Sequence, residues 1–204
     1  MKYRRPQSIG LENNMLKNQQ NILNRNHVML DFETLGTSAN CVVASLGAVV
    51  FNHDKILLEK EWHFDLDEQL RLGRKVSGGT IKWWMKQSDE SRKKTFLQPW
   101  VCGINQLFDD INSDLAIYNP CPWGNGADFD LPILQSLHAQ HKGNFLLPWK
   151  YTDHMCFRTF DAITGAKTLV KRDYSKHHCA LDDAKYQAQC TLEVFKQWQQ
   201  TTMI

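Results

Sequence analysis

A run of apolar and small residues at 41–51, CVVASLGAVVF, constrains the fold more than any other stretch of the chain. Its β-branched residues and its lack of polar alternation are typical of a strand that is buried on both faces. Strand patterns lie on either side of it, HVMLDF at 27–32 and KILLEKEWHFDL at 55–66. Because short connections join the three strands, they are predicted to form an antiparallel meander within one sheet.

Helical periodicity dominates after residue 77. The stretch GGTIKWWMKQSDESRKK at 78–94 predicts a helix, with Thr80 available as its N-cap. The other predicted elements are helices at 101–111, from Asp130 onward, at 154–163 and at 180–200, and strands at 114–119 and 148–153. The chain is therefore predicted to be an α/β protein, with a mixed five-stranded sheet and helices on both faces.

Residues 1–26 differ in composition from the rest, being basic and rich in Asn and Gln. They contain too few large apolar residues to pack by themselves, which predicts a flexible extension or a marginal helix. The basic charge can attract phosphates, but a solvated tail explains the same composition. Residues 27–204 are predicted to form a single domain.

Bulk properties exclude several classes of protein. The net charge of +2 does not by itself argue for a nucleic-acid partner. The 6 Cys show no CxxC pair and no zinc-like spacing, which is typical of reduced, mostly buried thiols. No apolar run approaches the roughly 20 residues that span a bilayer. A cytoplasmic protein without a membrane partner is therefore expected.

Two carboxylates, Asp31 and Glu33, end the first strand pattern. Because side chains alternate along a strand, both project from one face and Phe32 projects from the other. Like charges this close repel each other, and a divalent cation relieves the repulsion. Acid pairs at strand ends are also common without a metal, so the pair alone leaves both interpretations open.

Two further acidic positions lie at the starts of predicted helices. In GNGADFD the glycines permit a tight turn, and Asp130 stands either as a ligand or as a simple N-cap, with Asp128 as a local competitor. In HHCALDDA, His178 precedes the last helix and Asp183 lies in its first turns, so both can face one cleft. The same residues are also explained without catalysis, because acidic side chains in the first turn of a helix interact favourably with the helix dipole.

The order and spacing of these motifs resemble those of the DEDDh 3′→5′ exonucleases, which include proofreading subunits and ribonuclease T. The first motif of that superfamily is DxE after a strand, and Asp31-Phe32-Glu33 match it. The second ends in an aromatic residue followed by Asp at a strand-to-helix turn, and Phe129-Asp130 match it. The resemblance covers residues 28–200 and implies a ribonuclease H-like fold.

The third motif of the superfamily is HxAxxDA, and it is matched without a gap by His178, Ala180, Asp183 and Ala184. A shift by one residue gives His177 and Asp182 at the same separation, but the small residues favour the first alignment. Asp128 replaces a residue that is usually uncharged in the family, so it either tunes the site or faces water.

A narrower likeness comes from TIKWWMKQSDESRK, WGNGADFDLPIL and PWKYTDHMCFRTF. These stretches look like the branch that contains exonuclease VIII, T-even phage exonuclease A and the related mycobacterial exoribonucleases. In that branch the WW-x-x-Q element follows the first sheet hairpin, as it does in this chain.

The resemblance implies a two-metal site with His178 as the general base. Oxygen ligands suit Mg²⁺ or Mn²⁺ better than zinc, and the implied ligands of the two ions are Asp31, Glu33, Asp130 and Asp183. The substrate would be single-stranded DNA or RNA with a free 3′ end, and the product a nucleoside 5′-monophosphate. Thr34 and Leu35 would contact the terminal nucleotide, and Arg158 could bind backbone phosphates.

A metal-dependent 3′→5′ exonuclease is therefore the expected function. The alternatives are a phosphodiesterase limited to short oligonucleotides and a catalytically silent binding module, although the presence of all five catalytic residues argues against the module. The sequence does not distinguish DNA from RNA, and a homodimer is possible. Four aromatic residues either stack on nucleic-acid bases or pack in the core, and the sequence leaves both roles open for each: Trp83, Trp84, Trp123 and Phe157.

Overall fold

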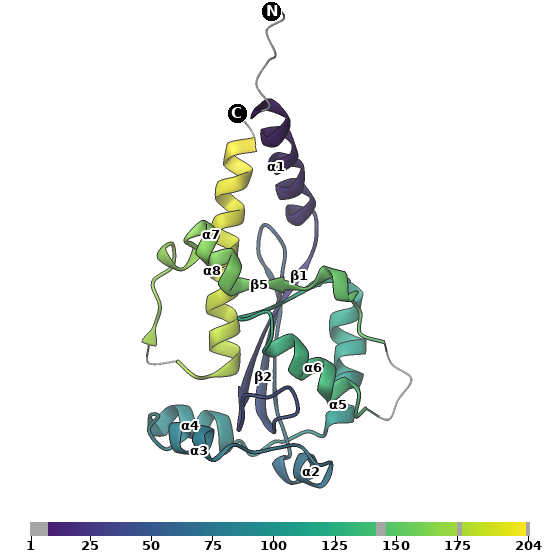
Figure 1. Cartoon of the computed structure of the whole chain (residues 1–204), viewed down its shortest axis with the longest axis vertical. Helices are drawn as coiled ribbons and strands as arrows, with labels where there is room; N and C mark the ends of the chain where they lie inside the picture. The colour runs from purple at the N-terminus through teal and green to yellow at the C-terminus, as the bar shows by residue number, and fades with distance from the viewer. Residues whose placement is uncertain (1–7, 142–145, 175–176, 203–204) are drawn as a thin grey trace, which may run out of the picture.

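A five-stranded sheet runs through the centre of the molecule (Figure 1), in the computed structural model that describes residues 8–141, 146–174 and 177–202. The strands are β1 (His27–Thr34), β2 (Val43–Phe51), β3 (Ile56–His63), β4 (Cys121–Gly124) and β5 (Met155–Cys156). Their order in the sheet is β3-β2-β1-β4-β5. The first three pair in antiparallel fashion, β4 is parallel to β1, and β5 is parallel to β4. The predicted mixed five-stranded sheet is confirmed.

Helices cover both faces of this sheet. Figure 1 shows α8 on one side and α5 and α6 on the other. The helices are α1 (Ser8–Leu23), α2 (Leu66–Arg71), α3 (Gly78–Trp84), α4 (Asp89–Phe96), α5 (Ile104–Asp110), α6 (Asp130–His138), α7 (Phe157–Thr164) and α8 (Ala180–Thr202). Among the described residues, none of the helices has both the length and the apolar character to cross a membrane.

Alternation along β1 assigns its side chains to two separate cores. Val28, Leu30 and Phe32 pack into the cluster that contains residues of α5 and α6. Met29 packs into the other cluster, which contains residues of α8. Every residue of β2 is buried, as expected for a strand between two neighbours and two helical layers.

The predicted strand at 114–119 is wrong. Helix α5 continues there as a π-helical turn, Ile111–Leu115, and a short 3₁₀ turn, and the chain then reverses at Asn119 with a φ of 43°. Ile111 and Leu115 extend the buried stripe of α5, so helical packing prevails over the β-like composition. The strand predicted at 148–153 is also wrong, because a 3₁₀ turn lies there and β5 follows it.

The single helix predicted at 78–94 is two helices, α3 and α4. Ser77 is the N-cap of α3, accepting a hydrogen bond from the Thr80 N–H at 3.4 Å, so Thr80 is the partner of the cap and not the cap itself. Ser88 starts α4 in the same way, accepting from the Ser91 N–H at 3.1 Å. The break lets α3 end beside the last residue of β1, where the Trp84 indole N–H donates to the Thr34 carbonyl at 2.8 Å.

The N-terminal segment forms a helix, α1, within its described part. Leu23 at its end is 7% exposed and belongs to the core cluster on the α8 side. The Ile22 carbonyl lies 3.0 Å from Nε2 of the buried His27 on β1. The domain boundary after residue 26 and the flexibility of the extension stay predictions, and residues 1–7 lie outside the described range.

Candidate active site

Strand β1 presents Asp31 and Glu33 on the face covered by α8. They follow Met29 at alternate positions, and Met29 is buried in the core on that side. In the antiparallel pairing with β2, Asp31 lies opposite Gly47 and Glu33 lies opposite Ser45. The pair therefore sits over the sheet, below the start of α8, as the strand alternation predicts.

Helix α8 brings Asp183 to this pair through a close approach to the sheet. A Cβ on Gly47 would lie 2.3 Å from the Ala180 carbonyl oxygen, so only glycine lets the first turn of α8 rest on β2 at this point. One carboxylate oxygen from each of Asp31, Glu33 and Asp183 lies within 4.8 Å of the others. Three of the four predicted metal ligands thus converge.

The fourth carboxylate, Asp130, stands at the start of α6 and is 2% exposed. Its two oxygens accept hydrogen bonds from the backbone N–H groups of Phe32, at 3.2 Å, and Asn125, at 2.8 Å. Gly124 permits this fit, because a Cβ there would lie 2.9 Å from the Asp130 Cβ. Asp128 is exposed, so the structure places its side chain toward solvent.

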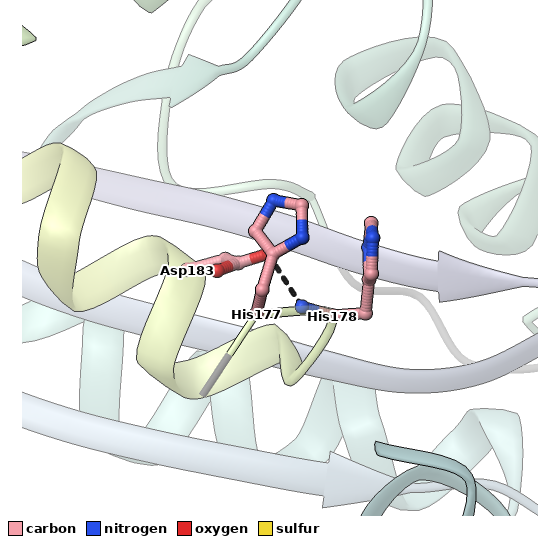
Figure 2. A group of neighbouring side chains, drawn as sticks. All are labelled: His177, His178 and Asp183. Carbon is pink, nitrogen blue, oxygen red and sulfur yellow. Dashed lines mark hydrogen bonds between the residues drawn. The ribbon is translucent and has the colours of Figure 1, made fainter. Parts of the chain in front are cut away.

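His178 lies in the loop just before α8, in the left-handed region with a φ of 62°. One potential ligand atom from each of His177, His178 and Asp183 lies within 4.8 Å of the others, and the His178 N–H donates to Asp183 at 3.2 Å (Figure 2). The edge of the His178 ring meets Trp83 with centroids 4.7 Å apart. Burial lowers the pKa of His178 to about 4, with a further effect of the neighbouring His177, so the imidazole is neutral at neutral pH.

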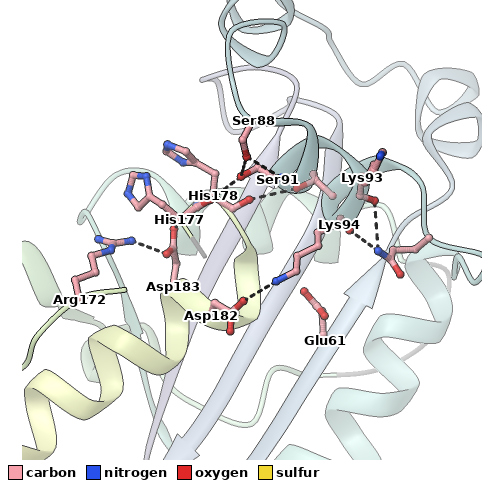
Figure 3. Close-up of polar contacts among 12 residues, drawn as sticks. Glu61, Ser88, Ser91, Lys93, Lys94, Arg172, His177, His178, Asp182 and Asp183 are labelled. Atoms are coloured by element: carbon pink, nitrogen blue, oxygen red, sulfur yellow. Dashed lines mark hydrogen bonds and ion pairs between the residues drawn. The ribbon is translucent and has the colours of Figure 1, made fainter. Parts of the chain in front are cut away.

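Helix α4 holds the backbone of this histidine loop. Ser91 Oγ donates to the His177 carbonyl at 2.9 Å, and Thr95 Oγ1 lies 3.4 Å from the His178 carbonyl (Figure 3). On the far side of the α8 start, Asp182 pairs with Lys94 of α4 at 3.3 Å (Figure 3). Asp182 therefore anchors α8 to α4, while Asp183 faces the carboxylate cluster.

The site gathers carboxyl groups that have little contact with water: Glu33, Asp130 and Asp183 are buried, and Asp31 is half-buried. Burial raises the pKa of Asp31 well above its ordinary value, and the carboxylates of Asp130, Glu33 and Asp183 raise it further. Burial likewise raises the pKa of Glu33, and that of Asp130 to about 6. Such a cluster is stabilised by cations, and its purely carboxylate oxygens match the ligand preference of Mg²⁺ and Mn²⁺.

The family of the chain follows from a comparison over nearly its whole length. The model of the 3′-5′ exoribonuclease Rv2179c-like domain matches residues 26–195. The chain belongs to this family. The expected membership of the DEDDh exonuclease superfamily is thereby confirmed.

One curated protein and one solved structure extend the comparison. An exodeoxyribonuclease of Enterobacteria phage T4 is 29% identical over 123 residues, which are 53% of this chain and 54% of the phage protein. The zinc ion bound form of an E. coli ExoI–ssDNA complex superposes with a TM-score of 0.58 at 14% identity, over 87% of this chain and 42% of that chain. The chain thus spans about half the length of the phage relative, and the ExoI likeness confirms the ribonuclease H-like fold.

A pocket of about 430 Å³ adjoins the acidic cluster of the Rv2179c-like domain. Its walls include Glu33, Thr34, Trp83 and Phe129. Thr34 is buried, and its hydroxyl donates to the Gly36 carbonyl at 2.6 Å. The half-buried Leu35 is not among the described residues that line this pocket, so its contact with a base stays a prediction.

The other predicted binding residues divide between surface and core. Arg158 is exposed on α7, its guanidinium near Gly126 and close enough to lower the pKa of Asp130. Trp83 is 40% exposed, which leaves it available for stacking. The core interpretation holds for the other three aromatic residues, Trp84, Trp123 and Phe157, which are at most 4% exposed.

Sequence reasoning misses two residues of the site, Gly47 and Gln187, and it offers Arg172, a cation beside the third motif, only as a contact for backbone phosphates. Gly47 permits the approach of α8, Gln187 donates to Asp31, and Arg172 donates to Asp183 at 2.5 Å while its guanidinium lies over the Tyr186 ring. The only signal for Gln187 was its place one helical turn after Asp183. Arg172 and Gly47 belong to no motif, so nothing in the sequence marked their contacts.

Proposed function

We propose that this chain hydrolyses single-stranded DNA or RNA stepwise from a free 3′ end and releases nucleoside 5′-monophosphates. The observation that carries the proposal is the convergence of Asp31, Glu33 and Asp183 within 4.8 Å, beside the buried Asp130. Membership of a 3′-5′ exoribonuclease family and the likeness to a phage exodeoxyribonuclease support it. A homodimer and a cytoplasmic location stay predictions.

Two divalent ions, Mg²⁺ or Mn²⁺, are the proposed cofactors. Asp31, Glu33 and Asp183 would hold one ion, and Asp31 with Asp130 would hold the other. Bound there, such a pair supplies Lewis acidity to the attacking and leaving oxygens of an in-line displacement at phosphorus. The raised pKa values of these carboxyl groups support the assignment, because a cation relieves the repulsion that burial intensifies.

His178 is the proposed general base. A neutral imidazole can accept the proton of the attacking water at a ring nitrogen. Its lowered pKa keeps it neutral at pH 7, and Trp83 and the backbone contacts from Ser91 and Thr95 limit its movement. The left-handed backbone conformation of His178 indicates a loop whose shape is imposed by these neighbours.

The pocket beside Glu33 is the proposed position of the terminal nucleotide. Trp83 and Phe129 offer aromatic surface there, and base stacking contributes about 1–3 kcal/mol per base. Arg158, whose guanidinium lies near Gly126 and acts on Asp130, would bind a backbone phosphate. This arrangement supports a single strand threaded past the cluster with its last phosphodiester over the acids.

Digestion of end-labelled strands tests the function. With Mg²⁺, a 3′-labelled strand of DNA or RNA is expected to release its label as a mononucleotide at once, while a 5′-labelled strand shortens in a ladder. EDTA should abolish both reactions, and a circular single strand should stay intact. Internal cuts would reject the exonuclease, binding without release would favour the silent module, and cleavage of only the shortest strands would favour the oligonucleotide phosphodiesterase.

A further inference from the structure

We propose that Gln187 is a positioning residue, which orients Asp31 for the divalent ions; this inference rests on the proposed function. Gln187 lies on α8 one helical turn after Asp183, so both side chains point to the same part of the sheet. Its Nε2 donates to Asp31 Oδ1 at 2.7 Å. The two residues are 156 positions apart in the sequence, so the contact joins α8 directly to the first motif.

The unpartnered oxygen of Gln187 argues that packing does not explain this residue. The side chain is 4% exposed, and its Oε1 has no hydrogen-bond partner among the described residues. A buried acceptor without a partner is unfavourable, and an apolar side chain of the same length would avoid it. The presence of an amide at this buried position is therefore explained by its N–H group, which donates a hydrogen bond to Asp31.

A neutral donor suits a carboxylate that must also bind a cation. The amide stabilises the ionised form of Asp31 without cancelling its charge, whereas the guanidinium of Arg172 on Asp183 competes with a metal. One oxygen of Asp31 is fixed by this bond. Hydrogen-bond partners of metal-binding side chains commonly set both the orientation and the affinity of the ligand.

Calorimetric titration of the full chain with MnCl₂, without nucleic acid, tests the role of Gln187. Gln187→Met keeps the length of the side chain and removes the donor, and it is expected to weaken Mn²⁺ binding by about 10–100-fold. The activity of this variant should need correspondingly more Mn²⁺ and largely recover at saturation. Its thermal unfolding midpoint in EDTA should stay close to that of the wild type, because removal of the unpaired acceptor offsets the lost hydrogen bond to Asp31.

Gln189→Met provides a matched control, since it makes the same substitution on α8 at a side chain that is exposed. It should bind Mn²⁺ as the wild type does. The proposal is overturned if Gln187→Met binds Mn²⁺ within twofold of the wild type, or if Gln189→Met is weakened equally. A wild type that binds no Mn²⁺ would remove the metal site of the proposed function as well, so the two failures are distinguishable.

Discussion

Asp31→Asn is expected to lower kcat/KM on a single-stranded oligonucleotide by about 10³-fold or more, equivalent to about 4 kcal/mol of transition-state stabilisation. Asp31 is the carboxylate that both proposed ions would share, so its loss disrupts both. Asparagine keeps the shape, and its carbonyl can still accept from Gln187. The measurement is the initial rate of mononucleotide release from a 3′-labelled strand at saturating Mg²⁺.

Stability measurements separate this effect from misfolding. The pKa of Asp31 is raised in the folded chain, so its ionised form opposes folding at neutral pH. In EDTA at pH 7.5, Asp31→Asn should therefore unfold at the same temperature as the wild type or higher, and any gain should shrink as the pH falls and Asp31 itself becomes protonated. Asp128→Asn, an exposed change in the loop before α6, should keep wild-type activity. An active Asp31→Asn enzyme would reject the site.

Gly47→Ala is expected to have the second-largest effect, although Gly47 has no side chain to bind a metal or a substrate. The added Cβ would lie 2.3 Å from the Ala180 carbonyl oxygen, so the first turn of α8 must move away from β2. Asp183 lies on that turn and moves with it. We expect a loss of about 1–3 kcal/mol in the free energy of unfolding, and a fall of about 10²-fold in kcat, because small displacements of reacting groups are costly.

Gly78→Ala is the control for Gly47→Ala, because a Cβ there would meet no heavy atom of the described residues within 4 Å, apart from its chain neighbours and the backbone of its own helix. Denaturant unfolding and the end-label assay measure both variants. Gly78→Ala should behave like the wild type in each. Wild-type stability and activity in Gly47→Ala would show that the close packing of α8 on β2 does not hold Asp183 in place.

Local sequence patterns predict a helix or strand correctly where the residues of that segment alone determine its secondary structure. The β-branched run of β2 and the long amphipathic α8 are two such elements, and both were located correctly. The fourth strand was placed seven residues too early, because β4 has the sequence CPWG and both Pro and Gly are depleted in strands. Strand β4 lies between β1 and β5 because of tertiary packing, and its local sequence pattern carries no signal of that packing.

The acidic residues of the site were predictable because their order along the chain matches a known set of motifs. The contacts that support them were not, because they depend on the approach of distant elements. Gly47 is an ordinary glycine inside an apolar run, and only the structure shows α8 resting on it. Gln187 is one of several glutamines on α8, and it is distinguished only by its donation to Asp31.

Anomalous diffraction from crystals soaked in Mn²⁺ would show whether four carboxylates from β1, α6 and α8 bind a pair of divalent cations. Two anomalous peaks about 4 Å apart are expected, one bounded by Asp31, Glu33 and Asp183 and the other reaching Asp130. A map with no Mn²⁺ peak within ligand distance of these oxygens would contradict this assignment.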